Sequence, residues 1–252
     1  MPSTPRFSHL RRSSGLALTL LVAVTPGCGS TGLNNVEYPA TATGTTGDFI
    51  VGAHTITLEI ARLAFGPAYF CATRAASADL CPTAVNELAA IAELDGIDPA
   101  PQALGTVRGT SGSIRSVHHG WGLTWFPRQS TAGSLDPSLP PHSAHFEGTA
   151  TRAGTSFRFV ATVDVIPQIQ GELPIQGRRG SADISAETAA LTLSIDPRAW
   201  WAQVDFAELE ALGLAEVLIE ADTRAHDSVT LAMIAGTGLD FAWPLAAAGA
   251  SR

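Results

Sequence analysis

The chain of 252 residues carries 23 acidic side chains against 15 basic ones, which gives a formal net charge of −8. This balance argues against a nucleic-acid partner, because binding to phosphates needs clustered Lys or Arg. It also argues against electrostatic adhesion to anionic lipid. The length is sufficient for one domain with a sizeable core.

The first 27 residues have the layout of a secretory signal peptide. Arg6, Arg11 and Arg12 precede an uncharged apolar run over residues 15–24, and small residues follow it. That run is too short to span a bilayer, which needs roughly twenty residues. The junction Thr25-Pro-Gly-Cys28 resembles the lipobox of bacterial lipoproteins, in which the cysteine after the cut carries the lipid. The resemblance implies lipidation at Cys28; the alternative is a secreted protein cut near this residue.

Export fixes the expected location of the mature chain. Removal of residues 1–27 takes away three arginines and no acidic residue, and leaves a net charge of −11. We expect a body in the periplasm or at the cell surface, held to the bacterial envelope by its lipid, such as palmitate. The outer membrane is favoured, because Gly29 rather than the Asp linked to inner-membrane retention follows Cys28.

Two further cysteines, Cys71 and Cys81, enclose a short loop. In an oxidising compartment, a pair at this spacing is more typical of a disulfide than of a metal site. The alternative is two buried free thiols. A site made of cysteines alone would need more ligands than the chain supplies.

The segment after the signal is rich in Gly, Ser, Thr and Ala, and it predicts a flexible tether over residues 28–47. A single folded domain is expected over residues 48–244, with a disordered tail over 245–252. The Pro- and Ser-rich stretch 127–143 is typical of a long loop inside that domain.

Alternation of apolar and polar residues predicts strands over most of the domain. In residues 54–65 the alternation changes phase after Ile60, which predicts a bulge near Arg62. Residues 145–151 and 155–165 flank a turn that contains glycine, so they form a predicted hairpin. Further strands are expected at the stretches 68–71, 111–126, 181–184 and 191–195.

Helical signals are few. Asp196 before Pro197, and Asp205 three residues before Glu208, are typical of helix N-termini. Helices are therefore expected near 197–212, with others near 83–94 and 224–235. Many strands joined by a few short connecting helices predict a mainly β protein, an antiparallel β-sandwich.

The order of several short motifs resembles the MbnP-like domains, which are exported β-sandwich proteins linked to copper handling. The motifs are the strand at 57–63, the glycine-containing tract 113–123, the sequence His145-Phe-Glu-Gly148, and the closing segment 231–241. The resemblance implies a β-sandwich and suggests a metal role. Those domains carry Met-Tyr-Trp-x-Trp in their long loop, whereas this chain has Pro140-Pro-His-Ser-Ala-His145. No copper ligand is therefore carried over residue by residue.

Four histidines form two pairs that would suit copper or zinc. They are His118, His119, His142 and His145. Neighbouring residues of a strand face opposite sides, so one member of the first pair at most serves any site. A metal site would require three of these rings, or two with a carboxylate such as Glu147. The alternative is that they are surface or hydrogen-bonded strand-end histidines.

Other candidate sites have ordinary structural interpretations. The five tryptophans are expected mostly in the core, with only one of Trp200 and Trp201 fully buried. Glu208 and Glu210 are expected to be solvated, and Arg178-Arg179 to form a surface turn. No nucleophile elbow or phosphate loop is present. The sequence therefore favours a non-enzymatic, lipid-anchored domain that binds a protein or small molecule; the alternatives are a periplasmic or surface metal-handling protein, copper first, and an envelope hydrolase.

Overall fold

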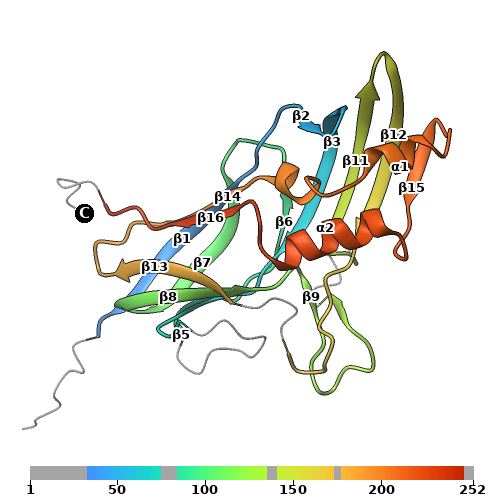
Figure 1. Ribbon diagram of the computed structural model, residues 1–252. Helices are drawn as coiled ribbons and strands as arrows, with labels where there is room; N and C mark the ends of the chain where they lie inside the picture. Colours follow the sequence, from blue (N-terminus) through green and yellow to red (C-terminus); the bar gives the residue numbers. More distant parts are fainter. Residues whose placement is uncertain (1–32, 75–83, 135–140, 173–176, 247–252) are drawn as a thin grey trace, which may run out of the picture. The chain divides into compact units, whose positions relative to one another are not determined.

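Two large β-sheets contain most of the strands (Figure 1). This computed structural model describes residues 33–74, 84–134, 141–172 and 177–246. In the first sheet the strands follow the order β13 (Arg178–Ile184), β8 (Gly112–His119), β4 (Ala68–Cys71), β5 (Ala84–Leu88), β7 (Gln102–Thr110), β1 (Asn35–Thr43), β14 (Leu191–Ile195) and β16 (Leu239–Ala242).

In the second sheet the order is β15 (Glu216–Ile219), β12 (Thr155–Val163), β11 (Ala144–Arg152), β3 (His54–Phe65) and β2 (Phe49–Val51), and β6 (Ala92–Asp95) also pairs with β3. Two described pairs are parallel, β1 with β14 and β12 with β15, and the others are antiparallel. The predicted fold class, a mainly β, sandwich-like protein with few short helices, is confirmed.

The predicted tether is wrong over β1. Residues 35–43 lie inside the first sheet, between β7 and β14, and Val36, Tyr38, Ala40 and Ala42 are buried on one face. The sequence conceals this strand because two of its four inward side chains are alanines between threonines, a composition shared with linkers. At the C-terminal end, Leu245 forms an isolated β-bridge with Thr188. The disordered tail, predicted over residues 245–252, therefore cannot begin at residue 245.

The predicted helix near 83–94 is also wrong. Residues 84–88 form β5 and residues 92–95 form β6, which belong to different sheets. Asn86, which is 1% exposed, accepts a hydrogen bond from the Tyr38 hydroxyl and donates one to the carbonyl of Thr110. Pairing with β4 and β7 thus overrides a local composition that favours helix.

The second sheet confirms the predicted hairpin and the change of phase in β3. β11 and β12 are joined by Ala153 and Gly154, which both have positive φ, as a two-residue hairpin turn requires. The register between β11 and β3 skips Glu59, because Glu147 faces Ile60 and Gly148 faces Leu58. The bulge therefore lies at Glu59, three residues before the predicted position.

Three helices cover the inner face of the second sheet: η1 (Pro197–Trp200), α1 (Phe206–Glu210) and α2 (Arg224–Ile234) (Figure 1). Asp196 and Asp205 cap η1 and α1, as predicted. Trp200 and Trp201 are both fully buried, which contradicts the prediction for that pair, because η1 is itself enclosed. Trp201 packs on Phe146 and Phe159 of the sheet. No helix in the described ranges has the length and apolar content needed to cross a bilayer.

Gly66 marks the place where the chain passes from β3 of the second sheet to β4 of the first. Its φ of +112° and the proximity of the Ala90 carbonyl exclude a larger residue. Directly before it, Phe65 contacts His119 of β8 and Phe241 of β16. The two sheets consequently share one core.

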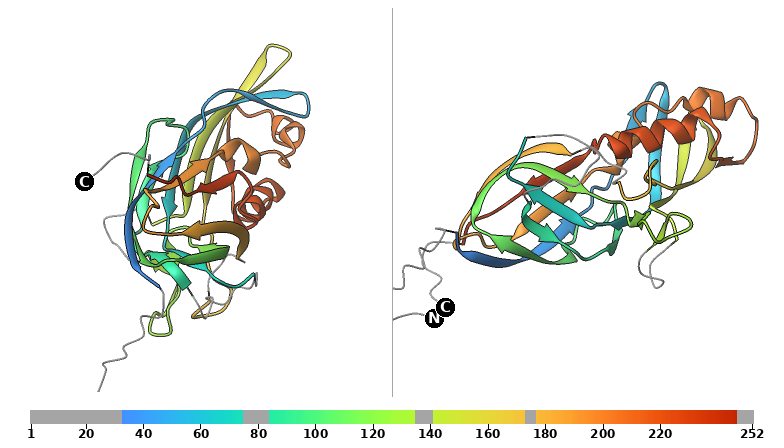
Figure 2. Two further views of the ribbon diagram at one scale, coloured as in Figure 1. Left: turned by 90° about the vertical axis from the view of Figure 1, so that its left-hand side faces the viewer. Right: turned by 90° about the horizontal axis from the view of Figure 1, so that it is seen from below.

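The first sheet curls until its two edge strands approach each other, as the two views of Figure 2 show. Arg178 on β13 donates hydrogen bonds to the carbonyl oxygens of Gly236 and of Leu239 on β16. A hollow of about 200 Å³ lies between these strands, bordered also by Phe241 and Trp243. The predicted surface turn at Arg178 is therefore wrong: this residue belongs to a strand and joins the two edges.

Candidate functional site

The first histidine pair lies in the core. His118 and His119 on β8 are both 0% exposed. The His119 ring stacks on Phe65 and meets Trp121 edge-on, and its two nitrogens have no hydrogen-bond partner among the described residues. Burial, followed by the nearby charges of Arg178 and His118, lowers the pKa of His119 to about 3. This ring is therefore neutral at neutral pH.

In the second histidine pair, His142 lies in the loop directly before β11 and His145 lies in β11, and both border one hollow of about 280 Å³. His142 Nδ1 is 3.0 Å from an oxygen of Asp164. His145 uses both ring nitrogens, with Thr162 Oγ1 at 3.2 Å and Glu147 Oε1 at 3.1 Å. The structure thus brings His142 and His145 to one place. Within the described ranges, no three His, Cys, Asp or Glu side chains form a group that could hold a metal.

Arg62 stands between this hollow and a second one of about 430 Å³. The second hollow is lined by Glu59, Glu93 and Asp95, together with Ile60 and Leu94. We call the two hollows together the Arg62 site. Cross-strand register explains it: Arg62 pairs with His145 of β11 on one side and with Asp95 of β6 on the other. Ala64, two residues along β3, also lines the first hollow.

The two hollows of the Arg62 site differ in the polar side chains that line them. One hollow holds Arg62 and two histidines, and the other holds Arg62 and three carboxylates. Ile97 N–H already donates to Asp95, and the Thr149 hydroxyl donates to Glu59. In the described structure, neither Arg62 nor Glu93 forms an ion pair or hydrogen bond through its charged group. Both groups are exposed and able to receive a ligand.

Sequence reasoning found part of this site. It named His142 and His145, and it identified Arg62 only as the place where the strand alternation fails. Glu93 was missed because it lies in the stretch 83–94 that was predicted as a helix, and Asp95, which follows that stretch, was assigned to no element. The bulge at Glu59 is the signal that could have indicated an unusual outward face, since bulges re-aim side chains near binding sites.

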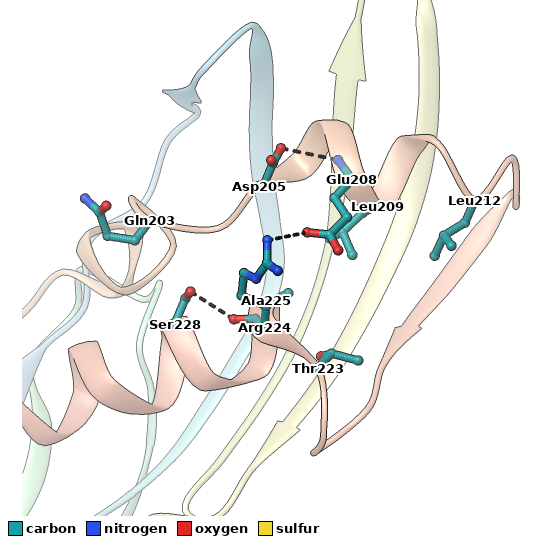
Figure 3. Close-up of a pocket in the computed structure, with 9 residues that line it drawn as sticks. All are labelled: Gln203, Asp205, Glu208, Leu209, Leu212, Thr223, Arg224, Ala225 and Ser228. Atoms are coloured by element: carbon teal, nitrogen blue, oxygen red, sulfur yellow. Dashed lines mark hydrogen bonds and ion pairs between the residues drawn. The ribbon is translucent and has the colours of Figure 1, made fainter.

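A separate groove of about 170 Å³ lies between α1 and α2 (Figure 3). Leu209 and Ala225 are buried at its base, and Leu212 is 56% exposed at its rim. Arg224 and Glu208 face each other across it, with Nη1 and Oε2 3.6 Å apart (Figure 3). Both side chains are mostly exposed, so this ion pair contributes little to stability.

Glu210 of the same helix is only 20% exposed and is engaged by other side chains, whereas the sequence predicted a solvated carboxylate. Its carboxylate lies 3.2 Å from Nε2 of His54 and also contacts the guanidinium of Arg152. His54 is 3% exposed and packs against Phe157 and Phe206. The cluster joins the start of β3 and the end of β11 to α1, and it has a structural role.

Of the three cysteines, the structure describes Cys71. Cys71 ends β4 and is fully buried. Cys28 and Cys81 lie outside the described residues, so lipidation and the disulfide stay predictions.

Comparison with other proteins adds no functional assignment. No family model matches the chain, and no curated protein or solved structure matches it either. The resemblance to MbnP-like domains rests on the motifs quoted above, and the function must be argued from the site.

Proposed function

We propose that the protein is an exported, lipid-anchored, non-enzymatic binding protein of a bacterial envelope, and that it binds a small charged ligand at the Arg62 site. The observation that carries the ligand site is the position of Arg62, which lines two adjoining hollows and has no ion-pair partner in the described residues. The anchor is supported by the signal-like segment and the Gly27-Cys28 junction.

Membrane fractionation of the expressed chain tests the anchor. Cys28→Ala should move the protein from the membrane fraction to the soluble fraction and abolish incorporation of a labelled fatty acid. Cys71→Ser is the matched control, because it also removes one cysteine but leaves the junction intact. Retention of Cys28→Ala in membranes at the wild-type level would show that no lipid anchor exists.

Binding at the Arg62 site is tested separately, with acetate, phosphate and ammonium as simple probes. Their addition to the mature chain should shift NMR signals of β3, β6 and β11, and Arg62→Gln should abolish the shifts caused by the anions. Arg108→Gln is a suitable control, since Arg108 is also an exposed strand arginine but lies in the other sheet. Equal shifts in Arg62→Gln and wild type would contradict the proposal.

Metal handling, with copper or zinc, is the second candidate function. It is favoured by one observation: His142 has a carboxylate at Nδ1, the arrangement that orients metal-binding histidines. Because both nitrogens of His145 are already engaged, binding would require that ring to release Glu147 or Thr162. Elemental analysis of the untagged protein, followed by Cu²⁺ and Zn²⁺ titration of wild type and His142→Ala, decides this alternative.

A further inference from the structure

We infer that the Arg62 site takes a zwitterion with well-separated charges, a peptide of two or three residues with free termini; this inference rests on the proposed binding function. The reason is that Arg62 forms the wall shared by the two hollows, and three carboxylates line the second hollow beside it. The ligand carboxylate lies against the guanidinium of Arg62, and the ligand ammonium lies near Glu93 and Asp95.

The strand register gives the separation of the two ends. His145, Arg62 and Asp95 stand in one row across β11, β3 and β6. Neighbouring strands lie about 4.8 Å apart, so the row spans roughly 10 Å. A ligand that meets both ends needs charges about 5 to 10 Å apart. An extended chain advances about 3.3 to 3.6 Å per residue, which fits two or three residues.

The hollows also suit a peptide in volume and lining. At about 280 and 430 Å³, they have the scale of small-molecule sites. Between the charged groups, Ile60 is half-buried and Ala64 is small, so a short apolar side chain would meet an apolar floor. The guanidinium of Arg62 can bind a carboxylate through two parallel N–H donors, which a lysine at this position could not do.

The test uses trialanine with the full mature chain, measured by calorimetry. We expect trialanine to bind, and to bind at least ten-fold tighter than either N-acetyl-trialanine or trialanine amide. In Arg62→Gln the free acid and the amide should bind equally. In Glu93→Gln the free and acetylated peptides should bind equally. Arg108→Gln should behave as wild type.

Three outcomes would overturn the inference. One is equal affinity for free and blocked peptides in wild type. Another is persistence of both preferences in Arg62→Gln and Glu93→Gln. The third is failure of trialanine to bind while acetate or phosphate still shifts the signals of β3, which would retain the proposed small-ligand site and exclude a zwitterion. If neither trialanine nor the simple ions perturb β3, the proposed function falls together with the inference.

Discussion

The guanidinium of Arg178 donates a hydrogen bond of 2.9 Å to the carbonyl oxygen of Leu239. The two residues lie on β13 and β16, the opposite edge strands of the eight-stranded sheet. Exposed edges are templates for pairing with other chains. The Arg178 side chain spans the gap between β13 and β16, and it thereby helps to hold the sheet in its curled form.

Replacement of Arg178 should therefore destabilise the fold. Burial lowers the pKa of Arg178, and Asp240 opposes that shift. The residue carries its charge at neutral pH because a guanidinium is effectively always protonated in proteins. Hydrogen bonds from a charged group contribute about 1.5 to 3 kcal/mol, and we expect Arg178→Gln to lose an amount in that range, as measured by urea unfolding. The exposed neighbour Arg179, changed to Gln, should lose less than about 0.5 kcal/mol. An equal loss of unfolding free energy in the two variants would show that Arg178 does not hold the two edge strands together.

The sequence predicted several strands in which large side chains carry the alternation, but it missed the short β15, where Val217 and Ile219 face inward. β3 and the β11–β12 hairpin were predicted because Ile, Leu and Phe mark their inward faces. β1 was missed because half of its inward residues are alanines, and β5 because Asn86 occupies an inward position where an apolar residue is expected. Its amide is satisfied by Tyr38 and Thr110, contacts that are distant in sequence and invisible to local patterns.

His119 should make the folded protein less stable in acid. Its pKa is about 3 in the folded state and 6.5 in the unfolded chain. Between these values the unfolded chain binds the proton and the folded one does not, so stability falls as pH decreases from 6.5 towards 3. The loss from one such group is at most about 1.4 kcal/mol per pH unit.

His119→Leu should isolate that contribution. Carboxylates also lose stability in acid, so the informative quantity is the difference in pH slope between wild type and variant. The variant should show the shallower slope between pH 6.5 and 4. At pH 7 it should be as stable as wild type or more stable, because it removes buried nitrogens that have no hydrogen-bond partner in the described part of the chain. Identical slopes would show that His119 is not buried as described.

Truncation tests the corrected boundary of the domain. A chain that begins at Leu33 retains β1, whereas a chain that begins at Asp48, the boundary predicted from sequence, lacks it. Removal of β1 separates β7 from β14 in the middle of the sheet. The longer chain should unfold cooperatively, and the shorter one should not. If both truncated chains unfold cooperatively at the same urea concentration, β1 is a linker and contributes nothing to the stability of the sheet.

The candidate site was less predictable than the fold, for a topological reason. Arg62, Asp95 and His145 come from three strands, and only the register of β3 with β6 and β11 brings them into one row. The histidines could be named as chemically capable residues. Their separation into a buried pair on β8 and an outward pair beside β3 could not be predicted without knowledge of which strand belongs to which sheet.

The predicted disulfide has a measurable cost on removal. For a loop of about eleven residues, the chain-entropy relation gives roughly 2.8 kcal/mol, so Cys71→Ser should lower the free energy of unfolding by about 2 to 3 kcal/mol. Thiol counting of the exported wild type under denaturing conditions should find neither Cys71 nor Cys81 reactive. Two reactive thiols would exclude the bridge.

Glu210 and Glu208 provide a matched pair within α1, and their contrast tests the buried cluster around His54. Glu210→Ala removes the carboxylate that contacts the His54 ring, which is 3% exposed, and it also takes this carboxylate away from Arg152. Loss of a partner by a buried polar group costs about 1 to 3 kcal/mol. Glu208 pairs with Arg224 in solvent, so Glu208→Ala should cost less than about 0.5 kcal/mol.

Urea unfolding at pH 7.5 measures the cost of both substitutions. The double variant Glu210→Ala with His54→Leu should recover part of the loss, because no buried ring is then left without a hydrogen-bond partner. A cost for Glu208→Ala equal to that of Glu210→Ala would mean that the two carboxylates are equally solvated, as their sequence pattern predicts.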